Sequence, residues 1–225
     1  IEQRCALWLL RENGQRKLKI NINTKRFIYL ISPNKIHNKN SFYLELEKLL
    51  KSKKIYFFQL RLKNYNEKQI IQIGKKVRFI CKKYKTKLII NDNPYIVKKI
   101  NADGCHLGQK DMKLNEAKKI INNKILGVTC HNSRKLVKKA INAKPTYIAI
   151  GAFFKSRTKQ IKYKADINLL KYVKKLTKIP VVTIGGISNK NYKKLLLNNA
   201  NFLAISGYIW NNKKYKPQEA MERLK

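Results

Sequence analysis

The chain has 225 residues, 44% of them hydrophobic, which fits one large domain and excludes a disordered chain. The formal net charge is +40 at pH 7, and the four scattered cysteines form no Cys-x-x-Cys pair, which excludes a zinc ribbon or a disulfide framework. No apolar run reaches the roughly 18 to 20 residues that cross a bilayer, and no signal peptide is recognisable, so we expect a cytoplasmic protein without membrane association.

The positive charge comes from lysines that are spread through almost every segment and interleaved with isoleucine and asparagine. No arginine-rich block or zinc-finger spacing accompanies them. A solvated lysine surface is therefore favoured over a face that binds specific nucleic acids. The positive field would still attract small anionic substrates.

Residues 1–25 form an extension that precedes the regular pattern. The apolar run CALWLL at 5–10 is typical of the start of a short amphipathic helix, and the sequence ENG at 12–14 would end it. We expect an N-terminal helix that covers the closed end of the following domain, which spans residues 26–225.

From residue 26 onward, short apolar runs alternate with segments of helical periodicity. The runs are continuously apolar, as strands buried on both faces must be. Eight strands are expected, at 27–32, 55–63, 88–92, 102–109, 125–129, 147–151, 180–186 and 202–206. Strict alternation over this length predicts a single (β/α)₈ TIM barrel. A doubly wound open sheet is the alternative, and it is less favoured because no Gly-x-Gly-x-x-Gly turn follows the first strand.

Two carboxylates follow neighbouring strands of this predicted barrel. Asp92 ends the run LIIND, and Asp111 lies just after ADGCHLGQ. Because parallel strands end at the same rim, we expect both carboxylates to lie close together there. Such a pair suits a hard divalent cation, and Mg²⁺ with a substrate phosphate is the usual occupant. The alternative for Asp92 is an ordinary helix cap.

Basic side chains follow other strands at the same expected rim. Arg61 and Lys63 stand at alternate positions and so share a face, and with Lys159 they could neutralise a pyrophosphate. Ordinary surface charges are the alternative. His106 is interpreted as a hydrogen-bonded rim residue, because no second histidine stands at metal-ligand spacing. His131 is undecided between proton transfer and a surface position.

Glycines mark a second anion site. Gly185 and Gly186 follow the seventh strand, and Ser206 and Gly207 follow the eighth. In TIM barrels a phosphate commonly binds to backbone N–H groups at this place. The alternative is that Gly185 and Gly186 only permit a tight turn.

Several motifs occur in a fixed order: QLRLK, LIIND, ADGCHLGQKDM, GVTCH, GAFFKSRTK and IGGI. Together they resemble the thiamine phosphate synthase family, within its superfamily with the thiazole tautomerases, over roughly residues 27–210. The resemblance implies a (β/α)₈ barrel that joins a hydroxymethylpyrimidine diphosphate to a thiazole phosphate and releases pyrophosphate. It also implies a role for Mg²⁺, with small phosphorylated molecules as partners. Whether the chain forms a homo-oligomer stays open.

The resemblance also implies site residues. The pyrimidine diphosphate would contact Gln59, Arg61, Lys63, Asn91 and Lys159. Asp92 and Asp111 would hold Mg²⁺, and Arg61, Lys63, Lys159 and Thr129 would act in catalysis. The thiazole phosphate would contact Ser156, Arg157, Thr158, Gly185, Gly186, Ile205 and Ser206. Three positions depart from the family pattern: Ala152 replaces a usual proline, Ser156 a usual threonine, and Thr129 a usual serine.

Two other functions compete with this hypothesis. A thiazole tautomerase would need the phosphate cradle and a proton-transfer group such as His131, but no pyrophosphate site. A nucleic-acid-binding barrel without activity is supported only by the net charge of +40. The set of Arg61, Lys63 and Lys159 with two aspartates favours the synthase.

Overall fold

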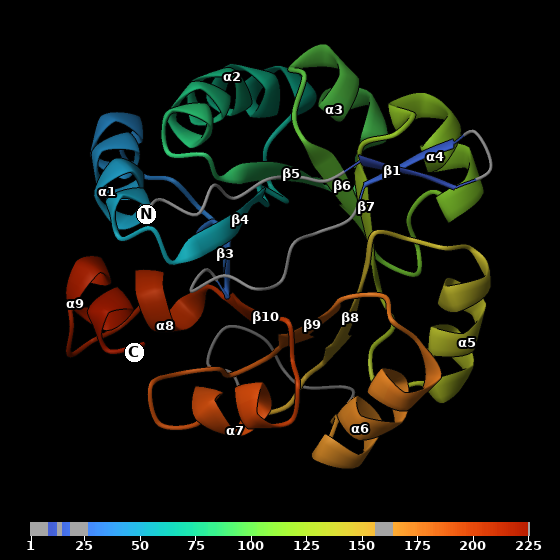
Figure 1. Ribbon diagram of the computed structural model, residues 1–225. Helices are drawn as coiled ribbons and strands as arrows, with labels where there is room; N and C mark the ends of the chain where they lie inside the picture. Colours follow the sequence, from blue (N-terminus) through green and yellow to red (C-terminus); the bar gives the residue numbers. More distant parts are fainter. Residues whose placement is uncertain (1–8, 13–14, 19–26, 156–163, 225) are drawn as a thin grey trace.

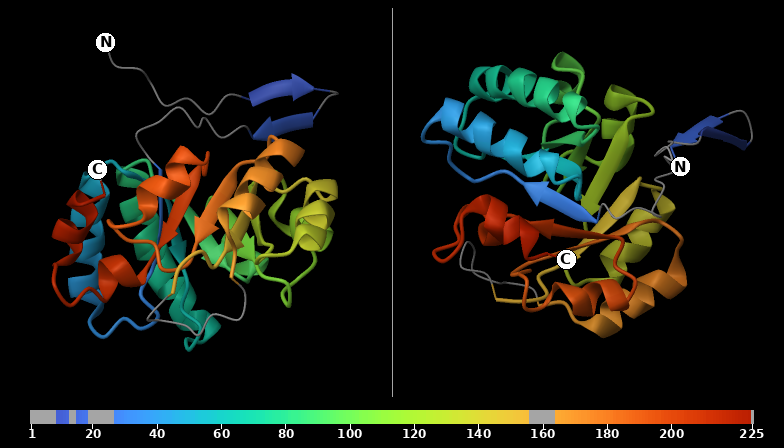
Figure 2. Two further views of the ribbon diagram at one scale, coloured as in Figure 1. Left: turned by 90° about the horizontal axis from the view of Figure 1, so that it is seen from below. Right: turned by 60° about the vertical axis from the view of Figure 1, so that its left-hand side comes forward.

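The computed structural model describes residues 9–12, 15–18, 27–155 and 164–224. Eight parallel strands close into a barrel, and helices lie around its outside (Figures 1 and 2). The strands are β3 Ile28–Ile31, β4 Ile55–Leu60, β5 Lys87–Asn91, β6 Gly104–Leu107, β7 Ile125–Thr129, β8 Tyr147–Gly151, β9 Val181–Ile184 and β10 Phe202–Ile205. They follow chain order around the barrel, and β10 closes onto β3. The predicted (β/α)₈ barrel is confirmed.

Helices occupy the segments between these strands and after the last of them. They are α1 Lys39–Lys51, α2 Glu67–Lys83, α3 Pro94–Lys99, α4 Leu114–Ile121, α5 Arg134–Asn142, α6 Ile167–Leu176, α7 Tyr192–Leu197, α8 Gly207–Trp210 and α9 Pro217–Glu222. Polar side chains cap several of their N-termini, and α9 packs beside α1 (Figure 1). Among the described residues, none of the helices combines the length and the apolar character needed to cross a membrane.

The strands are apolar throughout because both of their faces are buried. Outward residues such as Leu30 and Phe58 pack under the helices. Inward residues form a separate cluster in the lumen, where Phe57 and Phe202 lie with ring centroids 5.0 Å apart. This aromatic packing fills the lumen, so the polar groups that follow the strands are confined to its mouth.

The N-terminal segment differs from the expectation. Its described residues form β1 Leu9–Glu12 and β2 Gln15–Leu18, which pair antiparallel as a separate two-stranded sheet, so the helix predicted here is wrong at these positions. The register pairs Glu12 with Gln15, which leaves Asn-Gly as the connection. Asn-Gly is the dipeptide that most strongly favours a two-residue hairpin, and this local turn preference outweighs the helical spacing of a short apolar run.

Candidate active site at the barrel mouth

The two predicted carboxylates lie together where β5 and β6 end. The Asp92 backbone N–H donates to the His106 carbonyl at 2.8 Å, and the Gly108 N–H donates to Asp111 Oδ2 at 2.6 Å. The two carboxyl groups are within hydrogen-bonding reach of each other. Burial and the neighbouring Asp111 raise the pKa of Asp92 to about 6, although Lys63 and Arg61 oppose the shift. The expected proximity of the two carboxyl groups is therefore present.

Asp92 is not the cap of the following helix. Asn93 caps α3, because its Oδ1 accepts from the N–H groups of Tyr95 at 2.9 Å and Ile96 at 3.3 Å. Asp92 itself takes a left-handed backbone conformation with φ of 63°, which aspartate tolerates better than most residues. Its carboxyl group is therefore left available for the site.

Arg61 and Lys63 follow β4 and lie beside the carboxylates. Arg61 Nη1 donates to Asn34 Oδ1 at 2.8 Å, and the Arg61 N–H donates to Ser32 Oγ at 2.9 Å. Burial lowers the pKa of Arg61, and the nearby charge of Asp92 opposes that shift. Lys63 lines a pocket of about 430 Å³ together with Asn91 and Asp92. The structure thus brings Arg61 and Lys63 to the same rim as the two predicted carboxylates.

Inside the mouth, five polar side chains form a continuous hydrogen-bonded chain across the lumen. Gln59 Nε2 donates to Tyr29 Oη at 2.9 Å, and the hydroxyls of Tyr29 and Tyr147 are 2.7 Å apart. Tyr147 Oη is 2.9 Å from His106 Nδ1, and His106 Nε2 is 2.8 Å from Thr129 Oγ1. Burial lowers the pKa of His106 to about 4, which keeps the ring neutral at pH 7.

Sequence reasoning interpreted His106 correctly as hydrogen-bonded but missed Tyr29 and Tyr147. Each is a tyrosine at an inward position of a strand that is otherwise apolar. A buried phenol usually needs a hydrogen-bond partner, so a tyrosine within an apolar strand was the available signal.

The glycine side of the mouth is shaped by backbone. Gly185 and Gly186 have φ of 105° and 61°, and a Cβ on Gly186 would lie 2.2 Å from the Lys155 carbonyl oxygen. The Phe154 N–H donates to the Gly185 carbonyl at 3.0 Å, which joins this turn to the segment after β8. Ser206 Oγ, after the buried Ile205, donates to the Ser32 carbonyl at 3.2 Å.

Some predicted residues are not placed in this site. Ser156, Arg157, Thr158 and Lys159 lie outside the described residues. His131 follows β7 with φ of 50°, and its carbonyl accepts from the Gly151 N–H at 3.0 Å.

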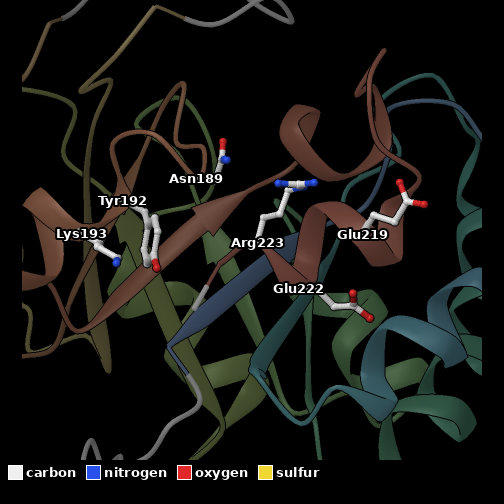
Figure 3. Close-up of a pocket in the computed structure, with 6 residues that line it drawn as sticks. All are labelled: Asn189, Tyr192, Lys193, Glu219, Glu222 and Arg223. Atoms are coloured by element: carbon white, nitrogen blue, oxygen red, sulfur yellow. The ribbon is translucent and has the colours of Figure 1, made fainter.

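A second pocket, of about 460 Å³, lies away from the predicted residues, between α7 and α9 (Figure 3). Its lining residues are Asn189, Tyr192, Lys193, Glu219, Glu222 and Arg223. None of them belongs to the predicted site, and their charges are of both signs. The barrel mouth therefore remains the candidate active site.

Comparison with known proteins gives a consistent answer. The family model described as thiamine monophosphate synthase matches residues 28–209. The thiamine-phosphate synthase of Pelagibacter ubique is 61% identical over 208 residues, which cover 92% of this chain and all of that protein. The enzyme of the same name from Erythrobacter litoralis is 35% identical over 81% of this chain and 87% of its own length.

The solved structures agree on the fold. A thiamine phosphate pyrophosphorylase from Pyrococcus furiosus superposes with a TM-score of 0.78 at 24% identity, covering 91% of this chain and 96% of that one. The family model covers most of the barrel, and two relatives exceed 30% identity over most of their length. This chain belongs to the thiamine monophosphate synthase family.

Proposed function

We propose that this enzyme is a thiamine-phosphate synthase. It transfers the hydroxymethylpyrimidine group from its diphosphate to the nitrogen of a thiazole phosphate, which yields thiamine phosphate and pyrophosphate. The observation that carries the proposal is the cluster of Arg61, Lys63, Asp92 and Asp111 at the carboxyl ends of β4 to β6 in a chain of this family. A tautomerase has no need of this pyrophosphate site.

Asp92 and Asp111 have the chemistry to hold Mg²⁺. Two carboxyl groups within hydrogen-bonding reach, one with its pKa raised to about 6, gain from a hard cation that takes oxygen ligands. Among the described residues, no three histidine, cysteine, aspartate or glutamate side chains gather as a metal site. Substrate phosphate oxygens and water would complete the coordination, and bound Mg²⁺ would stabilise negative charge on the departing pyrophosphate.

The basic residues act on the same leaving group. When the C–O bond to pyrophosphate breaks, its electron pair leaves with the pyrophosphate, and the electron-rich pyrimidine stabilises the remaining cation. Arg61, Lys63 and Lys159 stabilise the charge that develops on the oxygens. The thiazole nitrogen then forms the new C–N bond. Gln59 and Asn91 help to hold the pyrimidine diphosphate, and Thr129 acts in catalysis.

The protein itself supplies no nucleophile in this mechanism. Cys105 and Cys130 are the cysteines closest in sequence to the site residues. Burial raises the pKa of the Cys105 thiol far above its usual range and that of Cys130 to about 12, so both stay protonated. Direct attack by the thiazole on a pyrimidine cation agrees with these inert thiols.

The thiazole phosphate binds on the opposite part of the mouth. The turn at Gly185 and Gly186 offers backbone N–H groups, and Ser206 adds a hydroxyl next to Ile205. Ser156, Arg157 and Thr158 contribute from the segment after β8. Two anions are thus held by different means, one by side-chain charge and one largely by backbone.

The partners are small phosphorylated molecules, and no specific nucleic acid is among them. The lysines give a positive field that attracts such anions without base readout. We place the enzyme in the cytoplasm, which suits the free thiols of Cys81, Cys105 and Cys130.

The deciding experiment mixes the purified chain with the pyrimidine diphosphate and the thiazole phosphate, with and without Mg²⁺, and measures pyrophosphate release. We expect release that requires both substrates and the metal. Isomerisation of the thiazole phosphate without pyrophosphate release would instead support a tautomerase. Binding of nucleic acid without turnover would contradict both enzymatic assignments.

A further inference from the structure

The hydrogen-bonded chain across the lumen has a direction, and that direction can be derived from its first member. Gln59 presents Nε2 to Tyr29, and an amide nitrogen can only donate. Tyr29 Oη therefore accepts this bond and must place its own proton elsewhere. Among the described residues, the other partner of this hydroxyl is Tyr147 Oη at 2.7 Å.

The remaining donors follow one from another. Tyr29 donates to Tyr147, so Tyr147 donates to His106 Nδ1, which must be unprotonated. A neutral imidazole with an unprotonated Nδ1 carries its proton on Nε2, and Nε2 then donates to Thr129 Oγ1. Thr129 Oγ1 accepts this bond and keeps its own proton for another acceptor.

The reversed order of donors, running from His106 to Tyr29, would leave a buried hydroxyl proton without an acceptor as long as Gln59 Nε2 donates to Tyr29. If Nδ1 carried a proton, it would donate to Tyr147, and Tyr147 would donate to Tyr29. Tyr29 would then accept two bonds while its own proton had no acceptor, in a side chain that is only 1% exposed. A doubly protonated ring leads to the same conflict.

The lumen is built to admit the central phenol of this chain. Gly127 lies across from Tyr147, and a Cβ there would fall 1.9 Å from Tyr147 Cζ and 2.3 Å from its hydroxyl oxygen. Only glycine leaves room for the ring at this position. The aromatic ring of His106 also stacks on that of Tyr147, with centroids 5.6 Å apart and an interplanar angle of 13°.

We propose that Tyr29, Tyr147 and His106 are positioning residues that fix the hydrogen-bonding character of the two substrate contacts at the ends of the chain. Because the Gln59 side-chain N–H donates to Tyr29, the side chain presents its carbonyl oxygen to the substrate as a hydrogen-bond acceptor. Thr129 Oγ1 accepts a hydrogen bond from His106 Nε2, so its own hydroxyl proton is presented to the substrate as a donor. An aminopyrimidine offers the complementary groups, an exocyclic amino donor and ring nitrogen acceptors. This inference rests on the proposed function for its substrate but not for its geometry.

The tautomer of His106 is the direct test. The chain has three histidines, so ¹⁵N-labelled histidine in the full-length protein gives few signals, and a His106→Gln variant identifies those of His106. Without substrate at neutral pH, we expect an unprotonated Nδ1 and a protonated Nε2. A protonated Nδ1, alone or together with Nε2, would overturn the proposal, because it would mean that the Gln59 amide and every donor in the chain are reversed.

Tyr147→Phe tests the function of the chain, since it removes one hydroxyl and keeps the ring beside Gly127. We expect His106 to populate both tautomers and the KM for the pyrimidine diphosphate to rise roughly 5- to 10-fold, with the KM for the thiazole phosphate unchanged. Tyr29→Phe should have a smaller effect in the same direction. Tyr43→Phe, which removes a half-buried phenol hydroxyl on α1, should match the parent protein.

The two levels of inference fail separately. If the parent protein releases no pyrophosphate, the proposed function is wrong, while the histidine tautomer still tests the direction of the chain. If the parent protein is active but Tyr147→Phe keeps one tautomer and the same KM, the positioning role is wrong. An equal rise in both KM values would indicate a general structural defect and would also contradict the role.

Discussion

The two halves of the barrel mouth are built differently. At the ends of β4 to β6 the charged groups are side chains: Arg61 and Lys63 lie near the carboxyl group of Asp92, which neighbours that of Asp111. At the ends of β9 and β10, Gly185 and Gly186 form a backbone turn after β9, and Ser206 follows β10. In the first half, activity should depend on side-chain charge, pH and bound metal. In the second half, activity should be sensitive to any added side-chain volume. This difference suits a reaction in which one anion, pyrophosphate, leaves and the other, the thiazole phosphate, is retained in the product.

Asp92→Asn should give the largest effect on the charged half. The variant keeps the shape of the side chain but removes a ligand for the cation, and we expect kcat to fall roughly 100- to 1,000-fold. Steady-state pyrophosphate release measures this, and circular dichroism checks the fold. Glu116→Gln, which removes an exposed carboxylate on α4, is the matched control. Near-normal turnover in Asp92→Asn would contradict the metal role.

Arg61→Ala acts on the same half of the mouth and should reduce activity by a smaller factor than Asp92→Asn. Loss of a half-buried guanidinium leaves Lys63 and Lys159 as the remaining cations, and we expect kcat/KM for the pyrimidine diphosphate to fall roughly 10- to 100-fold. The KM for the thiazole phosphate should stay within about twofold. Equal losses for both substrates would show that the two halves are not independent.

Gly186→Ala should act on the other half alone. Its φ of 61° and the approach of a Cβ to 2.2 Å from the Lys155 carbonyl oxygen force the turn to move. We expect the KM for the thiazole phosphate to rise roughly tenfold, with little change for the pyrimidine diphosphate, because a shift of the turn misplaces its N–H groups.

Gly74→Ala on α2 is the control for Gly186→Ala, since its Cβ would meet only the flexible side-chain ends of Ile100, at 2.8 Å, and Leu60, at 3.5 Å. It should leave both KM values unchanged. A Gly186→Ala enzyme with parental kinetics would exclude the turn as a phosphate site.

The smallest effect concerns stability. The pKa of Asp92 is raised in the folded state to about 6 from 3.8, so the metal-free fold binds this proton more tightly than the unfolded chain does. The protonated Asp92 therefore contributes to the free energy of unfolding. This contribution is complete below pH 3.8 and is lost as the pH rises through about 6. The amide of Asp92→Asn does not ionise, so this variant does not lose stability as the pH rises. It should be more stable than the parent by about 1 kcal/mol at pH 7, after allowance for partial exposure.

Urea unfolding of both proteins without metal, from pH 4.5 to 7.5, measures this difference. It should grow with pH and vanish in excess Mg²⁺. A constant difference would mean that Asp92 does not titrate in this range.

The charged half was readily predicted from sequence. Asp92, Asp111, Arg61 and Lys63 each follow an apolar strand, and parallel strands of one barrel bring their carboxyl ends together whatever the intervening helices contain. The glycine turn was predicted by the same logic. The roles of these residues stay predictions, and Ser156 to Lys159 remain outside the described part of the chain.

The extension at 1–25 shows where this reasoning failed. A single apolar run in a short segment does not distinguish a helix from a strand, and the Asn-Gly turn signal pointed to the pairing of β1 with β2. Periodicity is informative only when it extends over several turns, as it does in α2.

The sequence by itself determined the alternation of strands and helices, the closed parallel barrel and the rim on which its charged groups lie. These features depend on local periodicity and on short connections, which are written in contiguous residues. The chain from Gln59 to Thr129 was decided only by the tertiary structure. Tyr29 and Tyr147 are 118 positions apart, and their hydroxyls meet because barrel closure turns both inward to the same depth beside the space left by Gly127.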